Sequence, residues 1–347
     1  MMNYVERASN REFVDFCFRS VLGREPDEKG MAVYVDALER KTLTRENIVF
    51  QFVLSEEFIQ RTKNAEFFPP GHYYSAIPSL DDRQAFLNST QLVKEIPGVY
   101  LNVDAQFELL QRFKNYYDEC PFRDYKSGSL RYYYVNPSYS YTDALTLYSI
   151  IREFKPSRMI EIGSGFSSCV MLDTSELFFG DQIDFTFIEP YPELLHSLIK
   201  EKDKKHAILP LKLQDVDSNI FRSLEANDIL FVDSTHVSKL GSDVNRIMFE
   251  ILPNLMNGVL IHFHDIFWPF EYPMDWVRKG MSWNEAYLLR AFLEFNENFE
   301  ILFFSSLLHK YHHNWFKENM SLCLKNAGGN IWLRKQKKAD EHAKVCP

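Results

Sequence analysis

The sequence lacks several features, and each absence excludes a class of protein. Its five cysteines stand far apart, with no Cys-x-x-Cys pair, so we expect neither a disulfide scaffold nor a zinc ribbon. It has no apolar run near the roughly 20 residues of a membrane span and no apolar signal core after its first methionine. We therefore expect a reduced, cytoplasmic protein.

The sequence also has no excess of positive charge. The formal net charge is −9, which argues against binding to nucleic acid or to an anionic membrane. Aromatic residues, by contrast, make up 15% of the chain. We expect part of this excess to line a pocket.

The stretch 158–166 organises the chain. Residues 158–162 predict a short buried strand, Gly163, Ser164 and Gly165 predict a tight turn, and a helix follows. Such a unit binds nucleotide-type ligands, because glycines allow close approach and the helix N-terminus offers free N–H groups. Glu161 directly before the glycines would repel a pyrophosphate but would accept an ammonium group.

Strands and helices alternate from this point on. Further strands are predicted at 183–188, 207–213, 229–232 and 258–263, and two late strands at 300–304 and 330–334. This alternation predicts an α/β fold, a Rossmann-like sheet of seven strands with helices on both faces. The first 62 residues predict a small all-α domain. We expect domains at 1–62, 63–135 and 136–340, the middle one connecting and contributing to the substrate side.

Acidic residues follow the strands in an ordered set. Glu189 ends the second strand, beside Pro190, where a carboxylate accepts ribose hydroxyls. Asp215 follows the third strand, where an adenine amino group is read, and Asp233 follows the fourth. The third glycine of the dinucleotide pattern is replaced by Ser168. A Rossmann-like fold that uses another cofactor remains an alternative.

The set Glu161-x-Gly-x-Gly165, Glu189, Asp215 and Asp233 resembles the class I S-adenosylmethionine-dependent methyltransferases. The resemblance implies S-adenosylmethionine as the cofactor and an enzyme that transfers its methyl group. The cofactor-binding residues implied are Glu161, Gly163, Ser164, Gly165, Glu189, Pro190, Asp215 and Asp233.

Acids and histidines follow the fourth and fifth strands, as Asp233-Ser-Thr-His236 and His264-Asp265. Both strand ends lie at the crevice where open α/β sheets bind ligands. The spacing is similar to that of metal-dependent O-methyltransferases acting on macrolide sugars. That resemblance implies a divalent metal such as Mg²⁺ on Asp233, His264 and Asp265, and His236 as general base. The family has a carboxylate where this chain has His264, so the metal stays open, as does the choice of His236 or His264 as base, with Asp265 beside them.

Aromatic stretches supply the expected substrate contacts. The run His264–Pro273 with Trp283–Tyr287, and Gly71–Ser75 upstream, looks like a bacterial methyltransferase family often found beside glycan-assembly enzymes. The acceptor is therefore expected to be a sugar or glycan hydroxyl, with a phenolic or other small metabolite as the alternative. The expected substrate contacts are His72, Tyr73, Tyr74, Glu271, Tyr272, Trp276, Trp283 and Asn284.

The first 60 residues carry a second resemblance. Val21–Asp27, Gly30 and Ser55–Phe58 resemble the domain of unknown function 4214, which is related to phycobilisome linker domains. It implies no chemistry, so we expect a module for binding a protein partner. A helical extension of the main domain and a binding protein without enzymatic activity are the alternatives.

Overall fold

The structure is a computed structural model, and it describes residues 8–59, 71–88, 93 and 95–336. The chain divides into two compact units, residues 1–85 and 86–347, each described by itself. The expected boundaries at 62 and 135 stay a prediction. Among the described residues, no helix has both the length and the apolar character that a membrane crossing needs.

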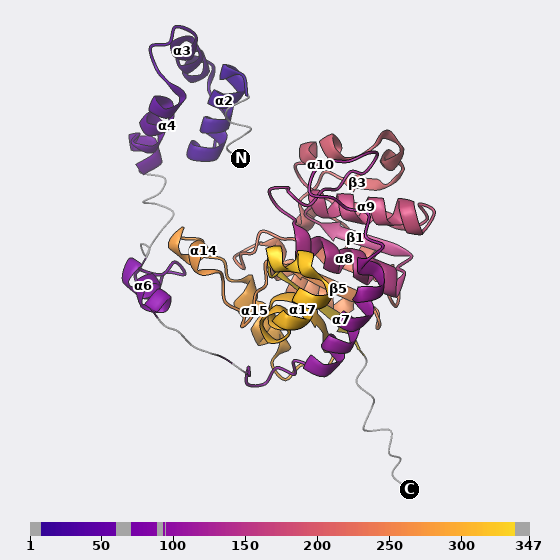
Figure 1. The fold of residues 1–347 in the computed structure, drawn as a ribbon. Helices are drawn as coiled ribbons and strands as arrows, with labels where there is room; N and C mark the ends of the chain where they lie inside the picture. The colour runs from indigo at the N-terminus through magenta and orange to yellow at the C-terminus, as the bar shows by residue number, and fades with distance from the viewer. Residues whose placement is uncertain (1–7, 60–70, 89–92, 94, 337–347) are drawn as a thin grey trace. The chain divides into compact units, whose positions relative to one another are not determined.

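The first unit is helical (Figure 1). Helices α2 (Asn10–Cys17), α3 (Glu28–Glu39) and α4 (Arg45–Val53) and the π-helical turn η1 (Phe18–Leu22) enclose a small core. Gly23 ends η1 with a φ of 57°, and Thr44 caps α4 by accepting from the Asn47 N–H. Helix α6 (Leu80–Asn88) begins in this unit.

The second unit contains one sheet of seven strands in the order β3-β2-β1-β4-β5-β7-β6. Strands β1 to β5 are parallel, and β7 runs antiparallel to both β5 and β6. The predicted α/β fold is thereby confirmed. The strands are β1 (Arg158–Ile162), β2 (Asp184–Ile188), β3 (Ala207–Leu209), β4 (Ile229–Val232), β5 (Leu260–His264), β6 (Phe299–Phe304) and β7 (Asn330–Lys335).

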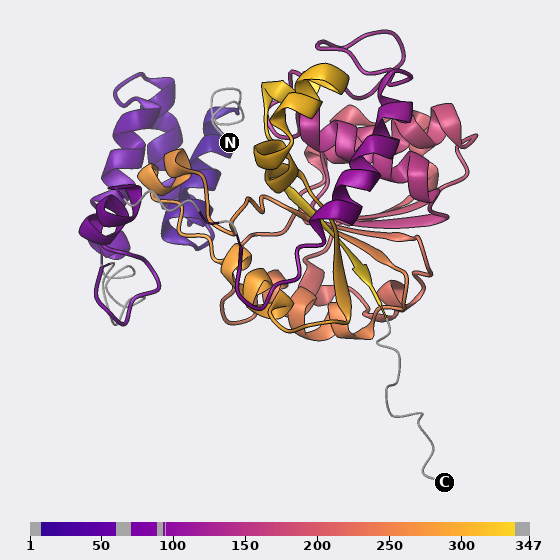
Figure 2. The same ribbon diagram turned by 60° about the horizontal axis from the view of Figure 1, so that its bottom comes forward.

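Helices cover both faces of this sheet, as Figure 2 shows, and two apolar cores fill the layers between. One core packs against α7 (Val103–Tyr117), α8 (Tyr141–Phe154), α9 (Phe166–Phe178), α16 (Ser305–Tyr311) and α17 (His313–Asn319). The other packs against α11 (Asn219–Arg222), α12 (Asp243–Arg246), η4 (Ile247–Ile251), α13 (Leu252–Asn254) and α15 (Glu285–Leu293). The remaining elements are α10 (Glu193–Leu198), α14 (Met274–Arg278), η2 (Glu201–Lys205), η3 (Leu213–Asp215) and η5 (Ser321–Lys325).

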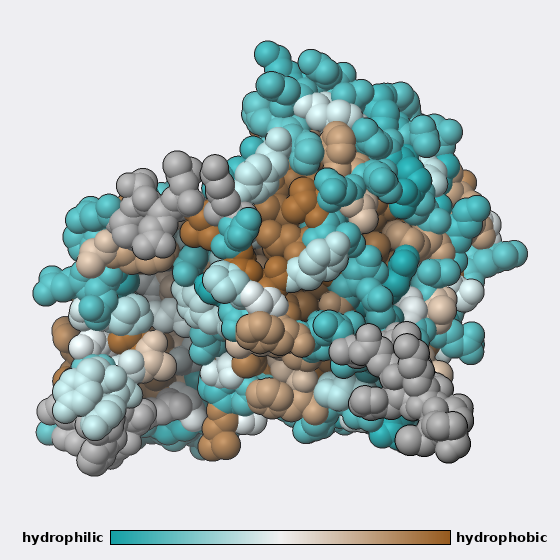
Figure 3. Space-filling model, turned by 90° about the horizontal axis from the view of Figure 1, so that it is seen from below, coloured by the Kyte–Doolittle hydropathy of each residue, from teal (hydrophilic) through white to brown (hydrophobic). Residues whose placement is uncertain are grey.

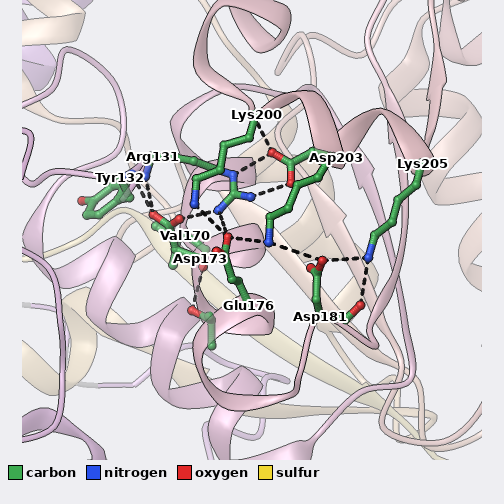
Figure 4. Close-up of polar contacts among 11 residues, drawn as sticks. Arg131, Tyr132, Val170, Asp173, Glu176, Asp181, Lys200, Asp203 and Lys205 are labelled. Atoms are coloured by element: carbon green, nitrogen blue, oxygen red, sulfur yellow. Dashed lines mark hydrogen bonds and ion pairs between the residues drawn. The ribbon is translucent and has the colours of Figure 1, made fainter. Parts of the chain in front are cut away.

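Residues 131–135 form no strand in the structure, and Arg131 there makes a buried ionic cluster (Figure 4). Its guanidinium pairs with Asp173 of α9 at 2.6 Å and with Asp203 of η2 at 2.7 Å. The backbone N–H groups of Arg131 and Tyr132 both donate to Asp173 at 2.8 Å. The cluster therefore ties an irregular segment to α9 and η2.

The surface of the molecule is mixed. Figure 3 shows hydrophilic residues (teal) over much of one face, with hydrophobic residues (brown) reaching the surface between them. Leu240 and Phe295 are examples of exposed apolar side chains in the second unit. Scattered apolar residues are normal on protein surfaces, so they indicate no binding site by themselves.

Candidate functional site

The turn after β1 requires a glycine at position 163. Its φ is +80°, and a Cβ there would lie 2.1 Å from the carbonyl oxygen of Asp233. The Gly163 N–H donates to the Ile188 carbonyl at 3.0 Å, and the Asp233 N–H donates to the Ile162 carbonyl at 2.8 Å. The turn thus draws together the ends of β1, β2 and β4.

Glu161 lies behind this turn. Its carboxylate is buried and accepts hydrogen bonds from the hydroxyls of Ser167, at 2.6 Å, and Ser168, both in the first turn of α9. Burial raises the pKa of Glu161 to about 8, against the lowering by these hydrogen bonds. Glu161 does not line the neighbouring cavity, so its contact with an amine stays a prediction. In the structure it holds the start of α9.

A cavity of about 440 Å³ opens at the carboxyl ends of β1, β2 and β4. Four of the predicted cofactor residues line it: Gly163, Glu189, Pro190 and Asp233. Glu189 accepts the backbone N–H of Tyr191 at 2.8 Å and that of Ser164 at 3.3 Å. The volume lies within the range typical of ligand sites, roughly 300–1,000 Å³.

Asp215 lies elsewhere than the sequence predicts. Strand β3 ends at Leu209 rather than near residue 213, and the chain turns through the 3₁₀-helical η3. Asp215 is exposed there and does not line the cavity, whereas its neighbour Gln214 does. The Gln214 side-chain amide donates to the Gly241 carbonyl at 2.8 Å. The early end of β3 is the reason for the difference.

Ser164 and Gly165 belong to the turn but do not line the cavity.

Three carboxylates surround the imidazole of His236. Its Nε2 lies 3.3 Å from Asp233 Oδ1 and 3.5 Å from Asp265 Oδ2, and its Nδ1 lies 2.8 Å from Glu285 Oε2. His236 and Glu285 are buried, and Asp233 also lines the cavity described above. The structure thus brings the predicted residues at the ends of β4 and β5 together beside that cavity.

Charge and burial oppose each other in this cluster. Burial lowers the pKa of His236, but hydrogen bonds with Asp233 and Glu285 outweigh it and raise the pKa to about 10. Burial raises the pKa of Asp265 to about 6, although His264 and His236 lower it. For Asp233, the raising by burial is outweighed by His264 and His236, so its pKa lies below the usual value. Such perturbed pKa values are typical of functional sites.

The loop after β4 fixes the place of His236. The φ of His236 is +59°, and the His236 carbonyl oxygen accepts the N–H groups of Asn284 and Glu285 at 3.1 and 3.2 Å. The Ser234 hydroxyl accepts the His236 N–H at 3.0 Å and donates to Glu285 Oε1 at 2.8 Å. Sequence reasoning missed Glu285, because it lies on a helix far along the chain and only the fold brings it to His236.

His264 stands slightly apart from this group. Its Nε2 lies 3.5 Å from Asp265 Oδ1, and its Nδ1 has no hydrogen-bond partner among the described residues. Among the residues that the structure describes, Asp233, His236 and Asp265 form a group of three whose possible metal-binding atoms lie within 4.8 Å of one another. In this geometry His236, rather than the predicted His264, completes a possible set of metal ligands. Two carboxylates and one imidazole suit a divalent cation.

Aromatic side chains cover the cluster. The Trp283 ring lies 4.4 Å from the His236 ring, and the Trp276 ring lies 5.1 Å from the Trp283 ring. The other predicted substrate contacts are engaged within the protein. The Tyr272 hydroxyl accepts the Ala286 N–H at 3.0 Å, and Glu271 accepts the Tyr287 hydroxyl at 2.8 Å.

Asn284 and the upstream residues His72, Tyr73 and Tyr74, which the sequence predicts as substrate contacts, also interact with other residues of the protein. The Asn284 amide accepts the Ser238 N–H at 2.6 Å and donates to the Ser238 carbonyl at 3.2 Å, so the structure uses both its ends to hold the loop. His72 stacks on Tyr73 at 4.3 Å and accepts the Tyr74 N–H at 3.1 Å. These three residues belong to the first unit, and their contact with substrate stays a prediction.

Two parts of this chain match known protein families. Residues 160–266 match a family described as "Methyltransferase domain", and residues 2–62 match a "Domain of unknown function (DUF4214)". An uncharacterized protein of Archaeoglobus fulgidus is 32% identical over 169 residues, which cover 47% of this chain and 76% of that protein. The chain belongs to the family of this archaeal protein.

Two solved structures are similar in outline. An S-adenosylhomocysteine-bound methyltransferase of Podospora anserina is 15% identical, with a TM-score of 0.37, over 78% of this chain and all of that chain. A "putative methyltransferase" of Thermobifida fusca is 10% identical, with a TM-score of 0.32, over the same shares of the two chains.

Proposed function

We propose that this chain, an S-adenosylmethionine-dependent methyltransferase by its matched domain, methylates a hydroxyl group of a sugar or glycan acceptor. The observation that carries the proposal is the place of His236. It lies within hydrogen-bond reach of Asp233, and Asp233 in turn lines the cavity beside the glycine turn. A proton acceptor thus stands next to the proposed cofactor site.

The cofactor side is proposed to work mainly through fixed backbone and one carboxylate. S-adenosylmethionine supplies an electrophilic methyl group on a sulfonium. Glu189 is the proposed partner of the ribose hydroxyls, because its carboxylate lines the cavity and is held by the N–H groups of Ser164 and Tyr191. Gly163 permits the close approach of the backbone at the end of β4, since a side chain there would meet the Asp233 carbonyl oxygen.

The acceptor side is proposed to work through proton transfer. Sugar hydroxyls are poor acids, so the oxygen needs a base as it attacks the methyl group. His236 is our proposed base, with Nε2 as the atom that takes the proton. Asp233 and Asp265 on that side would stabilise the imidazolium that forms. Because Asp233 lines the cofactor cavity, a cationic ligand there weakens its hold on a His236 proton and favours the neutral base.

A divalent cation fits the same side chains. Asp233, His236 and Asp265 would hold it, and it would make a bound hydroxyl more acidic. His236 would then be a ligand instead of the base, since its Nε2 serves only one of the two roles. His264 is proposed to act on Asp265 by charge rather than as a ligand.

The acceptor class is proposed from the aromatic cover. Trp283 packs against the His236 ring and Trp276 packs against Trp283, and such side chains commonly pack against sugar rings. The test is a screen of nucleotide sugars and glycans that follows S-adenosylhomocysteine release. We expect turnover with a hydroxyl-bearing glycan. Turnover with catechols or other phenols alone would overturn the sugar assignment and favour the small-metabolite alternative.

The helical unit is proposed to bind a protein partner in the cytoplasm. Phe50 and Leu54 at the end of α4 are 66% and 70% exposed and suit a protein contact. A Phe50→Ser/Leu54→Ser variant should keep its turnover with a soluble acceptor and lose co-purifying protein. Unchanged co-purification would contradict this role.

A further inference from the structure

Glu285 is a fully buried carboxylate that the sequence analysis did not single out. Only 1% of its surface is exposed, and both its oxygens are engaged, one by His236 Nδ1 and one by the Ser234 hydroxyl. We infer that Glu285 is a positioning residue, which holds His236 so that Nε2 faces Asp233 and Asp265. The inference rests on the proposed function, because it assigns a task to the residue behind the proposed base.

The hydrogen bond decides which nitrogen of His236 is free. A neutral imidazole carries its proton on one nitrogen and accepts through the other. In the neutral ring, Glu285 Oε2 at 2.8 Å from Nδ1 keeps the proton on Nδ1, so Nε2 is the nitrogen that carries the lone pair. A buried carboxylate has the same task behind the histidine of Ser-His-Asp hydrolases. Nε2 therefore points to the side of Asp233, which lines the cofactor cavity.

The backbone around Glu285 holds the same arrangement. The N–H groups at the start of α15 donate to the His236 carbonyl, and the Asn284 amide pairs with Ser238 at both its ends. Trp283 packs against the His236 ring from the same segment. The loop after β4 is thus clamped to the N-terminus of α15, which gives the ring the precision that catalysis needs.

The proton transfer balances with this assignment. As the acceptor oxygen forms its bond to the methyl carbon, the carbon–sulfur bond breaks and its electron pair goes to sulfur. The hydroxyl proton goes to His236 Nε2, and the ring becomes an imidazolium. Glu285 accepts from Nδ1–H before and after this step, and its negative charge stabilises the imidazolium.

The first test compares Glu285→Gln with a matched control at the opposite end of the same helix. Glu294 pairs with Arg290 at 3.2 Å, away from His236, so Glu294→Gln should change nothing. We expect Glu285→Gln to lower kcat about 10- to 100-fold, as loss of a partner behind a functional histidine commonly does. KM and the Kd for S-adenosylmethionine should stay within about threefold, since Glu285 contacts neither ligand.

A double variant tests whether Glu285 acts through His236. In the His236→Gln background, Glu285→Gln should cause no further loss of turnover, because the imidazole that Glu285 positions is already absent. A further loss of tenfold or more would overturn the inference, and so would a Glu285→Gln variant with unchanged kcat. If Glu285→Gln does not fold, kcat, KM and Kd are compared in Glu285→Asp, which keeps the charge but has a shorter side chain.

A proton NMR experiment needs no acceptor. The Nδ1–H proton shared with Glu285 should give a downfield signal that disappears in His236→Gln. In Glu285→Gln the signal should move upfield or vanish, and in Glu294→Gln it should stay. A signal unchanged in Glu285→Gln would overturn the inference. A wild-type protein that shows this pattern but binds no S-adenosylmethionine would instead overturn the proposed function.

Discussion

Two groups of carboxylates in the second unit differ in their balance of charge. Around Arg131, four cations pair with four anions. The cations are Arg131, Lys200, Lys202 and Lys205, and the anions are Asp173, Glu176, Asp181 and Asp203. Figure 4 shows polar contacts within this group. At His236, three carboxylates face one imidazole, and His264 adds a second imidazole beside Asp265. The first group is balanced, and the second is not.

The difference separates a structural cluster from a functional one. Arg131 does not lose its proton in the physiological range, and its planar fork pairs with carboxylates in one fixed geometry. An imidazole, by contrast, gains and loses a proton near neutral pH, and its neighbours move that point. The balanced cluster joins elements of the fold, while the unbalanced one borders a cavity with room for a ligand.

The largest expected effect comes from breaking the balanced cluster. Arg131→Met leaves Asp173 and Asp203 buried without their cation, so we expect the free energy of unfolding to fall by about 3–5 kcal/mol. Lys202→Met is the matched control, because Lys202 is half-exposed and should cost at most about 1 kcal/mol. Denaturant unfolding measures both. Equal losses in the two variants would contradict the distinction.

Removing the proposed base should affect turnover and not cofactor binding. We expect His236→Gln to lower turnover at least about 100-fold, the lower end of the range for a general base. The Kd for S-adenosylmethionine should change less than threefold. The control is His196→Gln, an exposed histidine on α10 that should have no effect. Full activity of His236→Gln would remove His236 from the mechanism.

Removing the proposed ribose partner should weaken cofactor binding and leave turnover at saturating cofactor nearly unchanged. Glu189→Ala loses hydrogen bonds to a charged group, so we expect about 10- to 100-fold weaker S-adenosylmethionine binding. Turnover at saturating cofactor should stay close to the wild-type value. Glu193→Gln, an exposed acid close by on α10, is the control. Calorimetry that finds the Glu189→Ala affinity unchanged would show the assigned contact to be wrong.

A smaller effect is expected from acid. Burial raises the pKa of Glu176, but hydrogen bonds with Lys200, Lys202 and Arg131 outweigh it and lower the pKa to about 2. The pKa in the folded state lies below that in the unfolded state, so this stabilisation is present above about pH 4.5 and is lost as the pH falls toward 2. Between pH 4.5 and 2, the melting temperature should fall less steeply with pH for Glu176→Gln than for the wild-type protein. The same dependence of melting temperature on pH in both proteins would contradict the assignment.

The smallest expected effect is that of a chelator. If His236 is the base, turnover should be the same with and without excess EDTA. A loss of activity that added Mg²⁺ or Mn²⁺ restores would assign Asp233, His236 and Asp265 to a metal instead. The same titration on Asp265→Asn would then show weaker metal binding, which separates a metal ligand from an unrelated acid.

Local patterns predicted the fold well. The strand, the turn at Gly163 and α9 lie next to one another in the chain, so their pattern is visible in one short stretch. The end of β3 was predicted too late, because the end of a short strand leaves little trace in the sequence. Glu285 was missed for a different reason. Its meeting with His236 depends on how α15 packs, which no local pattern encodes.

The most direct test of the account is a calorimetric titration of S-adenosylmethionine into the wild-type protein. We expect one site per chain, with an affinity that depends on Glu189 and not on His236. No heat of binding at millimolar cofactor would contradict it, because the cavity between Gly163, Glu189 and Asp233 would then serve another ligand.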